Sequence, residues 1–344
     1  MKLGTGTFAG AFSLAALLSI VAPTDGRAEA LDFFARTRTL TLIVGTEAGG
    51  GYDAYGRLFA RYFARHFPGD ASVVVQNMPG ASGRRAAEFM YSTAPKDGTA
   101  MGTLEQNIPL TQILGRENVR FDVGRFNYLG NMSDTVSTAI VWHTSGVKTI
   151  DDAKEKEVIV GATGKTGTTE VFARLMNRTL GTKFRVVSGY PGGNDINLAM
   201  QRGEIGGRAS YSWDSLKSAN PDWLADNKVN ILVQIGLRKA PDLPDVPLLM
   251  DLVKDGTEHE VVRLFSASLE LGRVFLTPPD VPADRVQLLR GIFDTAVGDP
   301  GLREEARRMQ IDINPARGVD VQKIIASLLA EPPAVIEQAK ALTQ

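Results

Sequence analysis

The strongest constraint on the fold of this chain is a pattern that occurs twice along it. In each occurrence an apolar run of strand character leads into a glycine-rich turn, and the turn opens a stretch with helical periodicity. The first joins residues 40–45 to the turn 46–53, and the second joins residues 158–161 to the turn 162–168. Apolar residues between Tyr55 and Phe63 recur at the spacing of one helix face. Parallel βαβ units are built from such segments, so the pattern predicts an α/β protein.

Both glycine-rich turns have the features of an anion-binding site. The first turn of a helix has unpaired N–H groups and a partial positive charge, and both attract anions. Gly49, Gly50 and Gly51 lack the side chains that would keep a ligand away from the first backbone turn. The second turn ends at Thr168 and adds hydroxyl groups. Because the turns lie in different halves of the chain, they predict a small anion that is held from both sides.

Strand-like and helix-like runs alternate from about residue 38 to residue 236, and the second half of this region repeats the order of the first. The C-terminal part is richer in helix and contains one strand-like run, which we expect to complete the sheet of the first domain. The predicted strands are residues 40–45, 72–76, 99–104, 157–161, 183–188, 205–210 and 272–276, and the predicted C-terminal helices are residues 282–297, 301–309, 319–329 and 333–342. The predicted domains are residues 31–134 with 241–344, and residues 135–240.

The N-terminal segment 1–30 has the pattern of a secretory signal peptide. Lys2 supplies a positive charge, residues 9–22 are apolar, and Ala28, Glu29 and Ala30 fit a small-residue cleavage site. A membrane-spanning helix needs about 20 apolar residues, and this run is shorter and interrupted. We therefore predict cleavage after Ala30 and a periplasmic mature protein, with an uncleaved membrane anchor as the alternative.

The composition argues against several classes of function. A formal net charge of -1 argues against a broad nucleic-acid surface, and the absence of cysteine excludes disulfides, thiol catalysis and zinc–thiolate sites. His66, His143 and His259 are scattered, and none lies in a glycine-rich turn. The sequence has no nucleophile elbow, zinc-protease motif or acidic calcium loop. We therefore expect no catalytic residue, no metal site and no cofactor, and the protein is not predicted to be an enzyme.

Two nucleotide-binding motifs are approached but not completed. Residues 49–54 fit G-x-G-x-x-A, but residues 76–77 are Gln-Asn where a dinucleotide-binding domain has an acidic residue for the ribose. Residues 164–166 match the end of a phosphate-binding P-loop, but Ile159 replaces its first glycine. What remains is a general anion site formed by backbone amides, hydroxyls and Lys165, or alternatively an ordinary turn between strand and helix.

Two charged positions have competing interpretations. Asp53 and Arg57 are four residues apart at the start of a predicted helix, which is the spacing of a helix-surface ion pair. Arg208 lies on the predicted strand 205–210, just before the aromatic segment 210–213. An arginine at this place is a candidate clamp for a ligand carboxylate, and an interdomain salt bridge is the alternative.

Several segments, taken in order, resemble the substrate-binding proteins of tripartite tricarboxylate transporters, the Bug or TctC-like family of periplasmic receptors. Two of them are Ile43-Val-Gly-Thr-Glu-Ala-Gly-Gly-Gly-Tyr-Asp53 and Val75-Gln-Asn-Met-Pro-Gly-Ala-Ser-Gly83. The others are residues 94–99, 161–168, 190–193, 238–247, 277–282 and 299–300. The order and spacing of these segments are more specific than any one of them, and the resemblance covers nearly all of the mature chain.

The resemblance implies a fold like that of type II periplasmic binding proteins, with two α/β domains, a ligand cleft between them and crossover strands as the hinge. It also implies that amides and hydroxyls of one loop from each domain hold a ligand carboxylate, partly through water. Together with the candidates from the residues themselves, the predicted ligand-binding residues are Thr46, Glu47, Ala48, Gly49, Gly50, Gly51, Tyr52, Asp53, Gly80, Ala81, Ser82, Gln106, Thr163, Gly164, Lys165, Thr166, Gly167, Thr168, Tyr190, Gly192 and Arg208. Glu47, Arg84, Arg85 and Arg208 depart from the usual pattern of the family, which leaves the identity of the ligand open.

These observations together predict an exported binding protein that captures a small carboxylate, a di- or tricarboxylate or a related organic acid, and delivers it to a membrane permease. Its expected partners are the ligand and the large and small integral-membrane subunits of a tripartite transporter. No nucleic-acid partner is expected, and the protein is expected to be a monomer. The alternatives are a ligand sensor for a two-component system and, with less support from the residues, a secreted enzyme that acts on a carboxylate.

Overall fold

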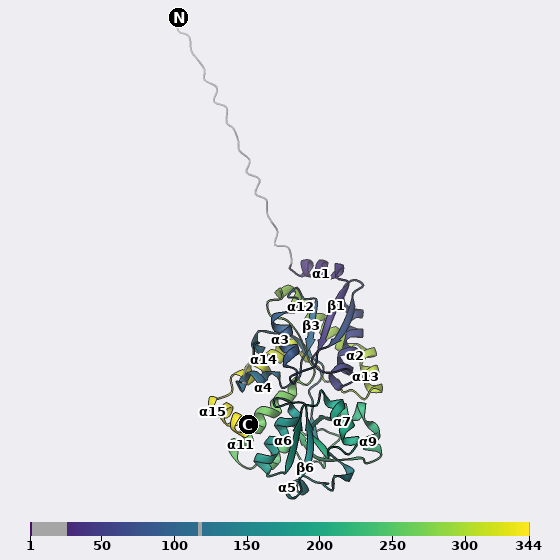
Figure 1. The fold of residues 1–344 in the computed structure, drawn as a ribbon. Helices are drawn as coiled ribbons and strands as arrows, with labels where there is room; N and C mark the ends of the chain where they lie inside the picture. The colour runs from purple at the N-terminus through teal and green to yellow at the C-terminus, as the bar shows by residue number, and fades with distance from the viewer. Residues whose placement is uncertain (2–25, 116–118, 344) are drawn as a thin grey trace.

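The protein is described by a computed structural model that covers residue 1, residues 26–115 and residues 119–343. These residues form two α/β domains, one above the other in Figure 1. The first sheet has the strand order β11-β4-β10-β3-β1-β2, and the second has the order β7-β6-β8-β5-β9. The predicted α/β class, with two domains, is therefore confirmed. Residues 2–25, which contain most of the predicted signal peptide, lie outside the described residues.

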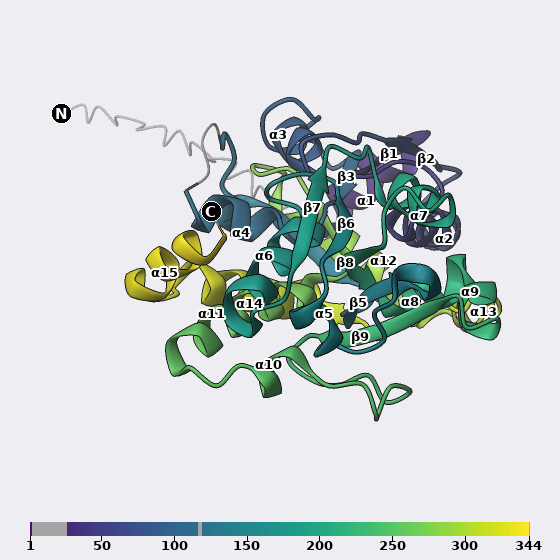
Figure 2. The same cartoon turned by 60° about the horizontal axis from the view of Figure 1, so that its bottom comes forward.

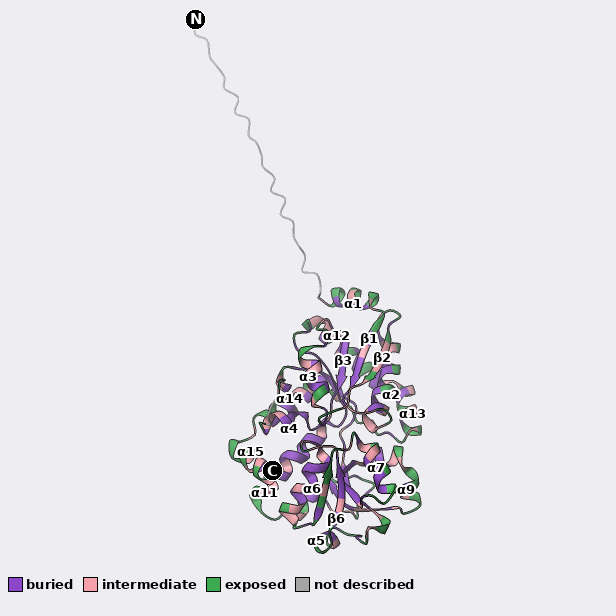
Figure 3. Cartoon of the chain, viewed as in Figure 1, coloured by how far each residue is buried: buried purple, intermediate pink, exposed green. Residues whose placement is uncertain are grey.

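The first sheet is built on three parallel strands whose apolar residues are covered by helices on both faces. The strand β1 pairs in parallel with β2 and β3, whereas β10 pairs antiparallel with β3 and β4, and β11 pairs antiparallel with β4. The last three residues of β1, Leu42, Ile43 and Val44, are all buried, as expected where a strand is covered on both faces; Figure 3 shows the buried part of the strand. The strands are β1 (Thr39–Val44), β2 (Ser72–Asn77), β3 (Ala100–Thr103), β4 (Asn127–Asn131), β10 (Val274–Thr277) and β11 (Ala316–Arg317).

An aromatic cluster holds the helix that follows the first glycine-rich turn against this sheet. The ring of Phe59 lies 4.1 Å from that of Phe275 on β10 and 5.4 Å from that of Phe293 on α12. The buried face of α2 includes Tyr55, Leu58, Phe59 and Phe63, as the periodicity predicted. The helices of this domain are α1 (Gly26–Arg36), α2 (Gly51–His66), α3 (Arg84–Ser92), α4 (Ile108–Ile113), η1 (Val123–Arg125), α12 (Ala283–Gly298), α13 (Pro300–Arg308) and α14 (Gly318–Leu329).

The second sheet repeats the arrangement of the first. The strand β6 pairs in parallel with β7 and β8, and β5 pairs antiparallel with β8 and β9. Figure 2 shows β7, β6 and β8 beside one another, with α6 on one side and α7 and α9 on the other. The strands are β5 (Ser137–Trp142), β6 (Val158–Ala162), β7 (Phe184–Ser188), β8 (Gly207–Ser212) and β9 (Val229–Ile235). The helices are η2 (His143–Ser145), α5 (Asp152–Glu155), α6 (Thr168–Leu180), α7 (Gly193–Gln201), α8 (Trp213–Ala219) and α9 (Pro221–Ala225).

The C-terminal part of the chain is shared between the two domains. Its strand β10 lies between β3 and β4 of the first sheet, where the sequence analysis expected it. In contrast to the expected division, α10 (Leu249–Leu252) packs near β9, and α15 (Pro333–Thr343) packs on α6 and α11. The helix α11 (Gly256–Ala267) continues into η3 (Ser268–Leu271), and its Phe265 ring makes an edge contact with Phe172 of α6, 6.4 Å away. These helices bury their apolar faces on the second domain because α6 offers an apolar surface there.

The segment around the predicted cleavage site is helical in this structure. Residues Gly26–Arg36 form α1, in which Ala30 and Phe34 are fully buried. Cleavage after Ala30 would cut within this helix, and it stays a prediction. In the described ranges, every helix is too short or too polar to cross a bilayer.

Candidate functional site

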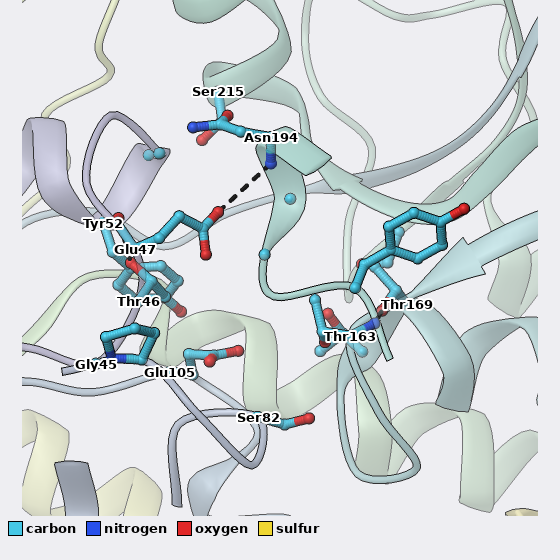
Figure 4. A pocket seen from close by; sticks show the side chains of 18 of the residues that line it. Gly45, Thr46, Glu47, Tyr52, Ser82, Glu105, Thr163, Thr169, Asn194 and Ser215 are labelled. Atoms are coloured by element: carbon cyan, nitrogen blue, oxygen red, sulfur yellow. Dashed lines mark hydrogen bonds between the residues drawn. The ribbon is translucent and has the colours of Figure 1, made fainter. Parts of the chain in front are cut away.

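A pocket of about 310 Å³ lies between the two domains, where the parallel strands of both sheets end. Loops that follow β1, β2 and β3 line one wall, and loops that follow β6 and β7 line the other, together with β8 and α8. The carboxyl edge of parallel strands is the usual location of a ligand site in open α/β sheets. Figure 4 shows side chains from both walls directed into the same space.

In the structure, 14 of the predicted ligand-binding residues line this pocket. They come from both glycine-rich turns, from the loops after β2, β3 and β7, and from β8. They are Thr46, Glu47, Gly50, Gly51, Tyr52, Gly80, Ala81, Ser82, Gln106, Thr163, Thr168, Tyr190, Gly192 and Arg208. The two turns thus contribute to one pocket, although to different extents.

Asp53 stabilises the first glycine-rich loop but does not line the pocket. Its buried carboxylate accepts hydrogen bonds from the Gly49 N–H (2.8 Å), Arg57 Nε (2.9 Å) and Asn77 Nδ2 (3.0 Å). Burial alone would raise the pKa of Asp53, but these hydrogen bonds outweigh it and hold the pKa below its usual value. Asp53 therefore supports the loop from outside the pocket lining, and the predicted pair with Arg57 is present. Ala48 and Gly49 lie exposed at the tip of the loop and also miss the pocket.

The second glycine-rich turn contacts the first domain with its middle residues. Asn107 Nδ2, from the first domain, donates to the Thr166 carbonyl at 3.1 Å. A Cβ atom on Gly164 would lie 3.0 Å from the Ser82 hydroxyl, and one on Gly167 would lie 3.1 Å from it. Lys165 is exposed. The structure consequently places Gly164, Lys165, Thr166 and Gly167 outside the pocket, because the turn crosses the domain interface.

The residues that flank this turn do face the pocket. Thr163, Thr168 and Thr169 line it, and the Thr163 N–H donates to the Thr169 hydroxyl at 3.1 Å. Among the described residues the Thr168 hydroxyl has no hydrogen-bond partner, and Thr168 is the first residue of α6. Free amides at a helix N-terminus and a free hydroxyl group suit the binding of a carboxylate.

Arg208 on β8 is a buried cation at the pocket. Its guanidinium donates to the Asn197 side chain (2.8 Å), the Ser210 carbonyl (3.1 Å) and the Gly193 carbonyl (3.2 Å), and it lies 4.0 Å from the centre of the Tyr211 ring. Burial lowers the pKa of Arg208 because it disfavours the charged form. No described carboxylate forms a salt bridge with Arg208, so the interdomain salt bridge that was the alternative is not present in the described ranges. The negative charge of Glu47 acts on Arg208 from beyond salt-bridge distance, and an anion in the pocket would supply a direct partner.

Glu105 is a pocket residue that the sequence analysis missed. It follows β3, is half-buried, and directs its carboxyl group into the space between Glu47, Ser82 and Thr163 (Figure 4). Its side chain makes no hydrogen bond to a described residue. Burial and the negative charge of Glu47 raise the pKa of Glu105 to about 8. The signal was its place one residue before Gln106, at the carboxyl end of a predicted strand.

Arg273 forms an interdomain anchor at the back of the pocket. Its Nη2 lies 3.1 Å from Asp214 Oδ2 and 3.0 Å from Ser215 Oγ, across the domain boundary. The Tyr55 hydroxyl donates to the same Asp214 oxygen at 2.7 Å, and the ring centres of Tyr52 and Tyr55 lie 4.7 Å from the guanidinium carbon. The residues of this network are far apart along the chain, so no local sequence pattern predicted it.

Glu47 reaches from the first domain to the second at the entrance of the pocket. Its Oε1 accepts a 3.4 Å hydrogen bond from the Asn194 N–H, the interaction drawn in Figure 4. Its carboxylate packs against Gly192, where an added Cβ would lie 1.4 Å from Oε2. Gly192 is the N-cap of α7 and has no side chain to cap that helix. The carboxylate of Glu47 therefore lies at a helix N-terminus that its own domain leaves uncapped.

The other lining residues were not predicted. They lie in the same loops, one or two residues beyond predicted positions, or in α7, β8 and α8. They are Gly45, Pro79, Asn107, Gly189, Pro191, Gly193, Asn194, Asn197, Ser210, Tyr211, Ser212, Ser215 and Ala219. Within the described ranges no three His, Cys, Asp or Glu side chains are placed to hold a metal ion. The arrangement is equipped to bind a small charged molecule.

Several known proteins are similar to this chain in sequence or in structure. No protein-family model matches the chain. The UPF0065 protein in gbd 5'region of Cupriavidus necator is 24% identical over 311 residues, which cover 88% of this chain and 87% of that protein. The periplasmic binding protein BugD aligns with a TM-score of 0.71 and 17% identity over 89% of this chain and 97% of its own.

Two solved structures with ligands are also similar. R. palustris Rpa4515 with adipate has a TM-score of 0.69 and 18% identity, covering 88% of this chain and 98% of its own. MatC from Rhodopseudomonas palustris with bound malate has a TM-score of 0.69 and 15% identity, covering 90% of this chain and 100% of its own. The resemblance expected from the sequence is confirmed, since the chain has the fold of the Bug and TctC periplasmic binding proteins.

Proposed function

We propose that this chain, which has the fold of the Bug and TctC binding proteins, captures a small organic carboxylate in the periplasm. It then delivers this ligand to the membrane permease of a tripartite tricarboxylate transporter. The ligand would occupy the interdomain pocket of about 310 Å³. Two domains that each contribute one wall allow binding to favour a closed arrangement.

The observation that carries this proposal is Arg208. A buried guanidinium that lines a pocket and has no ion-pair partner among the described residues is costly unless an anion joins it. Thr168 and the start of α6 lie in the same pocket and offer further donors. The adipate of Rpa4515 and the malate of MatC are carboxylates bound by proteins of the same fold, and they support this ligand class.

Similar solved structures such as BugD are binding proteins, and this supports a role without catalysis. Among the described residues, those that line the pocket carry carboxyl, guanidinium and hydroxyl groups and include no His.

A thermal-shift screen of the mature protein against mono-, di- and tricarboxylates tests the proposal. A ligand at 100 times its Kd should stabilise the folded protein by roughly 2.7 kcal/mol, which raises Tm by several degrees. Calorimetry would then give the affinity, and small-angle scattering would show a smaller radius of gyration when the ligand is bound. If no carboxylate shifts Tm, the proposed ligand class is wrong.

Delivery to a permease is tested separately in the native host. Deletion of the gene should abolish uptake of the identified carboxylate, and restoring the gene should restore it. Mass spectrometry of the exported protein tests cleavage after Ala30. Uptake that is unchanged in the deletion strain would argue against the transport role, even if the ligand binds.

A further inference from the structure

The two walls of the pocket differ in charge. The wall from the first domain carries Glu47 and Glu105, while its cation Arg273 is already paired with Asp214. The wall from the second domain carries Arg208, which has no ion pair among the described residues, although the negative charge of Glu47 acts on it across the pocket. A ligand that spans the pocket therefore meets carboxyl groups on one side and a guanidinium on the other.

The acidic wall also offers hydrogen-bond acceptors that have no donor. Glu105 makes no hydrogen bond to a described residue, and Glu47 accepts one at 3.4 Å. Gln106 also lines the pocket, and this residue is only 7% exposed. Its carbonyl oxygen Oε1 is buried without a hydrogen-bond partner. A buried acceptor without a partner is costly, so a donor from a bound molecule would be stabilising here.

We infer, on the basis of the proposed function, that the ligand of this pocket is an amino-substituted carboxylate whose ammonium group faces Glu105, Glu47 and Gln106. Its carboxylate faces Arg208 and Thr168. Ammonium has three donors and no acceptor, which matches the unfilled acceptors of the first wall. A second ligand carboxylate in that place would face the negative charge of Glu47 and would leave the Gln106 oxygen without a donor.

The protonation of Glu105 predicts the direction in which ligand affinity changes with pH. Glu47 is the charged group that acts on Glu105; the other titratable groups that line the pocket are Arg208, Arg273 and the tyrosines 52, 190 and 211. Since the pKa of Glu105 is about 8, its carboxyl group is largely neutral at pH 7 in the free protein. An ammonium group favours the ionised form, so its binding releases a proton and strengthens as the pH rises toward 8. A dicarboxylate would show the opposite trend.

Calorimetry with two matched series of probes tests the inference. The four-carbon series is succinate, 4-aminobutanoate and butanoate, and the six-carbon series is adipate, 6-aminohexanoate and hexanoate. Within each series only the group at one end changes between carboxylate, ammonium and methyl. The measurements are made on the wild-type protein and on Glu105→Gln, with Glu204→Gln as a control at an exposed glutamate outside the pocket.

We expect the amino compound of at least one series to bind the wild-type protein ten times more tightly than its dicarboxylate partner at pH 8. Its affinity should rise by up to about tenfold per pH unit below 8. Glu105→Gln should remove most of the preference and the pH dependence, whereas Glu204→Gln should keep both. Equal Tm values of the free variants would show that folding is not the cause.

Two outcomes separate this inference from the proposed function. If dicarboxylates bind more tightly than amino compounds and Glu105→Gln has no effect, the inference is overturned while carboxylate capture stands. If none of the six probes binds and the wider carboxylate screen is also negative, carboxylate capture fails and the inference fails with it.

Discussion

The two glycine-rich turns follow the same sequence pattern, yet they have different roles in the folded protein. Each follows a buried parallel strand and leads into a helix whose N-cap is a glycine without a side-chain cap, Gly50 for α2 and Gly167 for α6. The first turn lines the pocket along most of its length. The second turn lines the pocket only at its ends, while its middle touches Ser82 and Asn107 of the other domain. The shared sequence pattern thus determines that both segments form turns. What each turn contacts depends on the protein surface that lies opposite it.

Three residues give the two walls their charge, and two of these residues lie outside both turns. Glu47 belongs to the first turn, but Glu105 follows β3 and Arg208 lies on β8. The turns supply amides and hydroxyls, which suit many small anions, and these other positions supply charged groups. Substitutions in and behind the two walls can therefore separate what holds the walls together from what binds the ligand.

The largest effect is expected from Asp214→Ala, which removes the link between the walls without touching either turn. The change leaves Arg273 buried without its ion-pair partner and deprives Tyr55 of an acceptor. Breaking such a pair costs about 3–5 kcal/mol. Urea unfolding should show this loss, whereas Asp222→Ala, at an exposed ion pair with Lys228, should stay within about 1 kcal/mol of wild type. A loss below 1 kcal/mol for Asp214→Ala would mean that other contacts position the two walls.

Arg208→Ala tests the second wall. Loss of charge-assisted hydrogen bonds to a ligand carboxylate should weaken binding by roughly 1.5–3 kcal/mol, or about tenfold or more in Kd. The matched control is Arg202→Ala, since Arg202 is exposed and lies outside the pocket. Calorimetry on both variants, with Tm measured in the absence of ligand, separates binding from folding. An unchanged Kd for Arg208→Ala would assign Arg208 to holding Asn197 and the Gly193 carbonyl only.

A smaller effect should distinguish the edge of the second turn from its tip. Thr168 lines the pocket with a free hydroxyl, and Lys165 is exposed outside it. Thr168→Ala should weaken carboxylate binding by up to about tenfold, because one hydrogen bond to a charged group is lost. Lys165→Ala should change Kd less than twofold at 0.15 M salt, where exposed charges are screened. If Lys165→Ala has the larger effect, the turn moves on binding and its tip reaches the ligand.

The smallest effect concerns the first wall in the absence of ligand. The folded-state pKa of Glu105, about 8, lies above its ordinary value of 4.5. The neutral form is therefore favoured by folding, and the stability it contributes is complete below pH 4.5 and is lost as the pH rises through 8. Between pH 6 and 9 the Tm of the wild-type protein should fall by a few degrees relative to that of Glu105→Gln. Parallel Tm curves for the two proteins would show that Glu105 titrates normally.

The sequence allowed much of the fold to be predicted where local periodicity and burial agree. The helix predicted at residues 282–297 is Ala283–Gly298, and the strand predicted at residues 183–188 is Phe184–Ser188. The strands Asn127–Asn131 and Ser137–Trp142 were not named, although they carry the chain from one domain to the other. Asn127–Asn131 lacks an apolar run, since it ends in Gly130 and Asn131, whereas Ser137–Trp142 does contain one at residues 139–142 and could have been named from the sequence.

The candidate site could be predicted only in part, for a related reason. Arg208 stood out because a charged residue on a predicted buried strand needs an explanation. Asp53 looked like a pocket residue because it follows three glycines, but its hydrogen bonds to Arg57 and Asn77 direct it away. Arg273 gave no signal, since its partner Asp214 is distant in the sequence and comes close only when both sheets are formed.

The sequence by itself therefore determined the two strand–turn–helix segments, the position of their glycines and the fold family, because these depend on periodicity and on backbone conformation over a few residues. Only the tertiary structure decided which parts of the turns face the pocket and which face the other domain. It also decided that Glu105 and Arg208 lie on opposite walls. Charge complementarity and burial depend on what stands within a few ångströms across the domain boundary, and no local pattern in the chain encodes that distance.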